Sequence, residues 1–93
     1  MIVGTLHVEL HIPSALSLKD KRSAVKGLKD QLRAHFNVSV AELDANEKWQ
    51  RASLGVAAVG EDRRYVEGCL RQVVEWIERN HFVNVIRVEQ EYW

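Results

Sequence analysis

The sequence predicts an α+β fold in which two helices cover one face of a four-stranded antiparallel sheet. Three observations lead to it. Short segments have the apolar patterns of strands, two longer segments repeat apolar residues at helical spacing, and together they follow the order βαββαβ. A chain of 93 residues has room for one hydrophobic core, so we expect a single domain over residues 1–93.

The first strand and the first helix have clear limits. Between residues 2 and 12, apolar side chains fall at even positions (2, 6, 8, 10 and 12) and polar ones at odd positions (5, 7, 9 and 11), the alternation of a strand with one buried face. Pro13 ends this strand, because proline cannot donate to the ladder. Ser17 and Asp20 have the spacing of a capping box, so a helix is expected from there to about His35. Its apolar stripe is Leu18, Val25, Leu28, Leu32 and Phe36.

The rest of the chain is predicted to form a hairpin, a second helix and a last strand. The two hairpin strands, the helix and the last strand are expected at Phe36–Leu43, Ala52–Ala58, Asp62–Asn80 and Val83–Glu91. The hairpin turn should lie near residues 44–47, which favour turns, and Gly60 separates the hairpin from the helix. Two right-handed split βαβ units in this order make a ferredoxin-like βαββαβ sandwich.

Composition limits the functional classes. Thirteen basic and thirteen acidic residues cancel, so any surface for a polyanion must be local. The single cysteine excludes an internal disulfide, which is typical of a reducing compartment. The chain starts directly in a strand pattern and has no long apolar segment, so we expect a cytoplasmic protein without a membrane partner.

The first predicted helix has a basic stripe. Five cationic residues are spaced three, four, three and four apart, which confines them to a band roughly 80° wide on a helix. They are Lys19, Arg22, Lys26, Lys29 and Arg33. Residues 19–36 hold six basic and two acidic side chains, hence a local charge of +4. Such a row suits a phosphate backbone, and an ordinary solvated helix face is the alternative.

The second predicted helix has a different charge pattern. Its charged residues alternate in sign every four positions, as in a face stabilised by its own ion pairs. These residues are Arg63, Glu67, Arg71, Glu75 and Arg79. The first helix lacks this compensation, which favours an external anion. A second explanation stays open, in which Glu89 and Glu91 of the last strand neutralise the first helix within the fold.

The sheet face away from the helices offers a second candidate surface. Trp49 and Arg51 should lie there and could stack on and pair with unpaired bases. The alternatives are a self-association surface or packing of Trp49 over the sheet edge. The other residues expected on this face are Ser53, Gly55, Ala57, His7, Glu9, His11 and Arg87.

Other chemistry is not indicated. His7, Glu9 and His11 share a strand face but lack a further ligand cluster, so exposed histidines are favoured over a metal site. Cys69 lies on the helix flank near Leu70, which favours a small buried hydrophobe over a nucleophile. There is no CxxC, P-loop or GxGxxG motif, so we expect neither catalysis nor a cofactor.

Three motifs carry a resemblance to a known family. They are SLKDKRS at residues 17–23, FNVSVAE at 36–42 and WQRA at 49–52. On these the chain resembles the YlxP-like family of bacterial domains of unknown function, over essentially its whole length. The resemblance implies a ferredoxin-like fold without assigned catalytic residues. It also implies a gene neighbourhood with translation initiation factor two and ribosome-binding factor A, hence a role in small-subunit maturation or translation.

Two functional hypotheses follow. The first is a non-catalytic protein that binds ribosomal RNA or the small ribosomal subunit. The residues expected to make these contacts are Lys19, Lys21, Arg22, Lys26, Lys29, Arg33, Trp49 and Arg51. The second is a protein-interaction module, most simply a homodimer formed through the open sheet face or through the edge strand ending in Tyr92 and Trp93.

Overall fold

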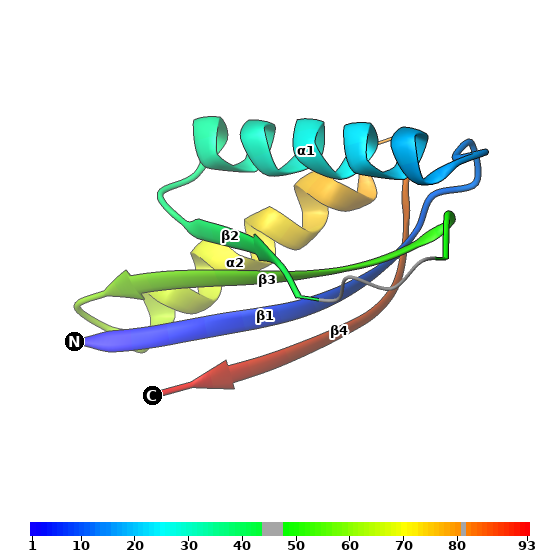
Figure 1. Ribbon diagram of the computed structural model, residues 1–93. Coiled ribbons are helices and arrows are strands. Elements are labelled where there is room, and N and C mark those ends of the chain that lie inside the picture. Colours follow the sequence, from blue (N-terminus) through cyan, green and yellow to red (C-terminus); the bar gives the residue numbers. More distant parts are fainter. Residues whose placement is uncertain (44–47, 81) are drawn as a thin grey trace.

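The elements follow the predicted order in the computed structural model, which describes residues 1–43, 48–80 and 82–93. They are β1 (Ile2–His11), α1 (Leu18–His35), β2 (Ser39–Glu42), β3 (Arg51–Gly60), α2 (Arg63–Glu78) and β4 (Asn84–Tyr92). The strands form one sheet in the order β2-β3-β1-β4, with antiparallel neighbours throughout. Figure 1 shows α1 and α2 on the same side of this sheet. The α+β, ferredoxin-like prediction is confirmed.

The core lies between the helices and the sheet. The even residues of β1 and β3 point toward the helices, and Val8, Leu10 and Leu54 are fully buried there. The helices supply the matching apolar stripes, which are Val25, Leu28 and Leu32 of α1 and Val66, Leu70, Val73 and Ile77 of α2. Neither helix is long and apolar enough to cross a membrane.

The hairpin strands differ from their predicted limits. β2 covers only Ser39–Glu42, because Phe36 ends α1 and its backbone N–H donates to the carbonyl of Leu32. β3 extends to Arg51 and Gly60, because β1 pairs with it from Ile2 to His11. The predicted turn at residues 44–47 lies outside the described residues.

The start of α1 is fixed by side-chain caps. Ser17 Oγ accepts a hydrogen bond from the Asp20 amide at 3.0 Å, as predicted for the N-cap. Asp20 Oδ2 accepts from the Leu16 amide at 3.0 Å, one residue earlier than the N-cap amide of a standard capping box. The two bonds set where α1 begins, and therefore where its basic residues lie.

Candidate nucleic-acid interface

The five residues of the predicted stripe form one flank of α1, which we call the basic flank. Arg33 contacts the edge strand, since its guanidinium donates to the Val40 carbonyl of β2 at 2.6 Å. Lys19 and Arg22 are exposed, and the Lys26 side chain is 77% exposed. Helical spacing puts Lys29 on the same side, where it is half-buried. The basic flank is Lys19, Arg22, Lys26, Lys29 and Arg33.

One carboxylate of the same helix offsets part of this charge. Asp30 lies 3.0 Å from the Lys26 ammonium and 3.7 Å from the Arg33 guanidinium. The hydrogen bond from Lys26, helped by the positive charges around it, lowers the pKa of Asp30 below its ordinary value. Two cations therefore share one anion, and both ion pairs are open to solvent, where such pairs contribute little.

The remaining cations of the basic flank form no ion pair within the described residues, although the charge of Lys29 contributes to lowering the pKa of Asp30. In residues 1–43, 48–80 and 82–93, Lys19, Arg22 and Lys29 make no ion pair or side-chain hydrogen bond. The carboxylates expected to neutralise them lie elsewhere. Glu89 pairs with Arg87 at 2.6 Å, and both Glu89 and Glu91 line a hollow on the sheet face away from the helices. That internal explanation is therefore wrong.

Lys21 must be removed from the predicted contact residues. It is 2% exposed and engaged in an interaction of its own, so its ammonium cannot reach a phosphate outside the protein. The sequence held a signal for this position. Lys21 precedes Val25 by four residues and Leu28 by seven, which places it on the buried face of α1 rather than on the basic flank.

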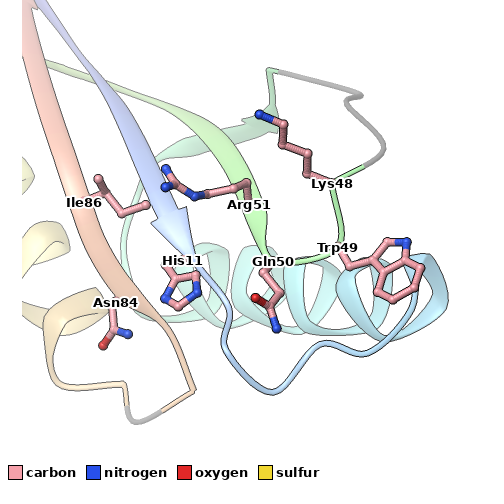
Figure 2. A pocket seen from close by; sticks show the side chains of 7 residues that line it. All are labelled: His11, Lys48, Trp49, Gln50, Arg51, Asn84 and Ile86. Carbon is pink, nitrogen blue, oxygen red and sulfur yellow. The ribbon is translucent and has the colours of Figure 1, made fainter.

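Trp49 and Arg51 line an open hollow of about 710 Å³ at one end of the free sheet face. The described residues of its lining include no carboxylate and are His11, Lys48, Trp49, Gln50, Arg51, Asn84 and Ile86. Arg51 and Asn84 lie opposite His11 on its two neighbouring strands, so the three form one row across the sheet. Figure 2 shows Arg51 pointing toward Ile86 of β4, whereas Trp49, which is 52% exposed, points the other way.

Gln50 has a role that the sequence reasoning missed. Its side-chain amide donates to the carbonyls of Pro13, at 3.1 Å, and Ala15, at 3.3 Å. Its own backbone carbonyl accepts from the Ile12 amide at 2.8 Å. Gln50 thus fastens the connection between β1 and α1 to the start of β3. The WQRA motif contains this residue, but only the fold shows that its partners lie more than thirty residues away.

Gln50→Glu should lower the free energy of unfolding by about 1–2 kcal/mol, because a carboxylate cannot donate and would face two carbonyl oxygens. Urea unfolding at neutral pH measures the change. The matched control is Gln72→Glu, which adds the same charge at an exposed position of α2. Equal stabilities for the two variants would show that the Gln50 side chain does not fasten this connection.

The other candidate chemistry can be assessed on the described residues. Cys69 is partly buried against the core, and desolvation raises the pKa of its thiol, which favours the protonated form at neutral pH. Among the described residues, no group of three or more histidine, cysteine or acidic side chains is arranged to hold a metal ion. His7 and His11 lie on the open sheet face, as predicted from their odd positions in β1.

Fold and site together define a small ferredoxin-like α+β domain with a cationic helix flank. The family described as "Protein of unknown function (DUF503)" matches residues 3–90. The chain is also 36% identical over 77 residues to "Uncharacterized protein YlxP" of Bacillus subtilis (strain 168), an overlap of 83% of this chain and 84% of that protein. The chain therefore belongs to the YlxP-like family, DUF503, as its motifs suggested.

Proposed function

We propose that this domain is a non-catalytic RNA-binding protein of the cytoplasm, which contacts ribosomal RNA through the basic flank of α1. The observation that carries the proposal is the charge balance of this flank. Lys19, Arg22 and Lys29 have no ion pair within the described residues. Asp30 is the one carboxylate there that pairs with the flank, and Lys26, Arg33 and the nearby charge of Lys29 share it. The gene neighbourhood implied by the family resemblance supports the small ribosomal subunit as the source of the RNA.

The geometry of the flank suits a phosphate backbone. Neighbouring cations on a helix lie about 5–6 Å apart, and the row from Lys19 to Arg33 extends for about 21 Å along the helix axis. Each phosphate that such a cation neutralises releases condensed counterions, and this release drives binding without requiring a particular base sequence. The flank can therefore bind an RNA strand by charge and spacing alone.

The predicted ion pairs of α2 form only at its start, since Arg71, Glu75 and Arg79 make no ion pair within the described residues. On α2, Arg63 pairs with Glu67 at 2.7 Å, and its guanidinium also lies 4.7 Å from the centre of the Tyr92 ring. The five cations of the basic flank contact neither an aromatic ring nor a carboxylate other than Asp30 in the described part of the chain. The two helices differ in net charge, which is +4 for residues 19–36 and +1 for the four basic and three acidic residues of 63–79, and this excess on α1 favours an external anion.

The phosphate contacts are assigned to α1 alone. The sheet face that holds Arg51 also carries Glu9, Glu89 and Glu91, whose carboxylates repel a polyanion. We therefore assign no phosphate contact to Arg51 and Trp49, which are proposed to contact an exposed base or a protein.

The test is a salt titration of binding to small-subunit ribosomal RNA and to intact small subunits. The logarithm of the binding constant should fall linearly with the logarithm of salt concentration, by about 0.7 for each single-strand phosphate contacted, so three to five contacts give a slope of about −2 to −3.5. A peptide nucleic acid of the same base sequence is the matched control, because it has bases but no phosphates. Absence of binding at low salt, or an affinity independent of salt, would reject the proposal.

A further inference from the structure

Within residues 1–43, 48–80 and 82–93, no helix covers the sheet face opposite α1 and α2, and this face is partly apolar. Leu43 is 53% exposed, Val59 54%, Ile86 44% and Trp93 63%, and all four belong to this face or its rim. Its middle is lined by small residues, Ala41, Gly55 and Ala57. Exposed apolar side chains gathered on one face mark an interaction surface.

The two sheet edges are poorly suited to strand pairing. β2 has only four residues, and the carbonyl of Val40 already accepts a hydrogen bond from Arg33. The pairing of β4 with β1 shifts its register between Glu9 and Leu10. β4 also carries charged side chains at alternate positions, among them Arg87 and Glu89. Short length, bulges and charges are devices that block edge-to-edge association. A partner is therefore expected on the face rather than at an edge.

Two neighbouring rows of side chains run across the strands on the open face. The charges and sizes of the side chains in one row are complementary to those in the other. The first row is Leu43, Ser53, Glu9 and Arg87, and the second is Ala41, Gly55, His7 and Glu89. We propose that the open face is a homodimer interface, with a two-fold axis that lies between these rows and runs perpendicular to the strands. Such an axis sets the first row of each copy against the second row of the other.

This arrangement places one pair of opposite charges near the axis, because Arg87 would face the partner's Glu89. Glu9 would face the partner's His7, whose imidazole N–H can donate a hydrogen bond to the carboxylate. Leu43 would face the partner's Ala41, so that a large side chain meets a small one. Because the axis is two-fold, each of these contacts occurs twice.

The same two-fold axis also sets the next row on one side of it against the next row on the other side in the partner. Arg51, His11 and Asn84 would oppose the partner's Ala57, Thr5 and Glu91, which belong to one row of the register. Because Arg51 points toward β4 in Figure 2, its guanidinium would lie over the partner's Glu91. The partner's Glu91 and Glu89 line an open hollow of about 420 Å³, which would receive the arginine head.

The size of the face fits a second copy. The four strands have 10, 4, 10 and 9 residues, which gives a footprint of about 500 Å², somewhat below the roughly 800 Å² per partner of a standard interface. A nucleic acid fits this face less well, because of its three carboxylates. The dimer shares Arg51 with the proposed function but none of the phosphate contacts, and it would leave a basic flank exposed on each copy and so offer an RNA two contact sites.

The test is sedimentation equilibrium over a concentration series, with charge reversals that can rescue each other. The wild-type protein should dimerise, and Arg51→Glu and Glu91→Lys should each weaken the dimer by about 100-fold, because like charges would then face each other twice. An equimolar mixture of the two variants should restore wild-type affinity, because each Glu at position 51 meets a Lys at position 91 and the native pair is kept. Ala41→Arg should block association by its bulk.

Each outcome decides the proposal. Circular dichroism first verifies that the variants keep the fold, which is expected because the changed side chains are exposed. A wild-type monomer at high micromolar concentration, single variants that dimerise normally, or a mixture that stays monomeric would each overturn the interface. A protein with Arg22→Glu and Lys29→Glu should dimerise like the wild type. Failure of RNA binding and failure of the dimer can thus be told apart.

Discussion

Reversing Arg22 and Lys29 together, as Arg22→Glu with Lys29→Glu, is expected to weaken binding to small-subunit ribosomal RNA by about 100-fold at low salt. Both cations lie on the basic flank and neither has an ion pair within the described residues, so the change removes two phosphate contacts without breaking an internal bond. The slope of the salt titration should become shallower by about 1.4, because two fewer phosphates are neutralised. Fluorescence anisotropy with a labelled RNA gives both values.

The matched control is Arg64→Glu with Arg71→Glu. Both residues are exposed on α2, and the double variant changes the net charge by the same amount. If binding follows overall charge alone, the two double variants will bind with the same reduced affinity. An equal reduction in both would contradict a site on α1, whereas a selective reduction in the α1 variant supports it.

Gly4→Val is expected to lower the free energy of unfolding by about 3 kcal/mol, because the core at this point has no room for a side chain. A Cβ atom at Gly4 would lie 2.5 Å from Val66 Cγ1 and 2.9 Å from Leu70 Cδ1, both on α2. The backbone at Gly4 does not have a positive φ, so the glycine is needed for the close approach of α2 to β1 rather than for its conformation. Urea unfolding measures the loss of stability.

Gly27→Ala is the control, and it is expected to raise the free energy of unfolding rather than lower it. Gly27 lies on an exposed part of α1, and a Cβ there would meet no atom within 4 Å. Replacing a mid-helix glycine by alanine should therefore stabilise the protein by about 0.5–1 kcal/mol. A Gly4 variant as stable as the wild type would show that α2 can move away from β1 at little cost.

The fold was predictable because its signals are local and periodic. The alternation in β1 and the stripes of α1 and α2 gave the element order, and the spacing of Ser17 and Asp20 gave the helix start. The limits of β2 and β3 were less accessible, because pairing with the neighbouring strand decides where a strand ends. Phe36 illustrates this point, since its pattern fits a strand while its amide closes the last turn of α1.

The site was predictable only in part. The spacing of the basic flank follows from helical geometry alone, whereas the charge balance around it depends on contacts between distant segments. Lys21 was placed wrongly because its charge was given more weight than its position on the buried face. Gln50 was missed because its partners belong to the connection before α1. The opposed charges of the open sheet face likewise became visible only through the register of β1 with β3 and β4.

The most direct measurement of the central claim is an NMR titration of the ¹⁵N-labelled protein with a short single-stranded RNA at low salt. The amide signals of Lys19, Arg22, Lys26, Lys29 and Arg33 should shift first and furthest, and added salt should reverse the shifts. The exposed face of α2 should change little. Shifts concentrated on α2 or on the open sheet face, or no shifts at all, would contradict the assignment of RNA binding to the basic flank of α1.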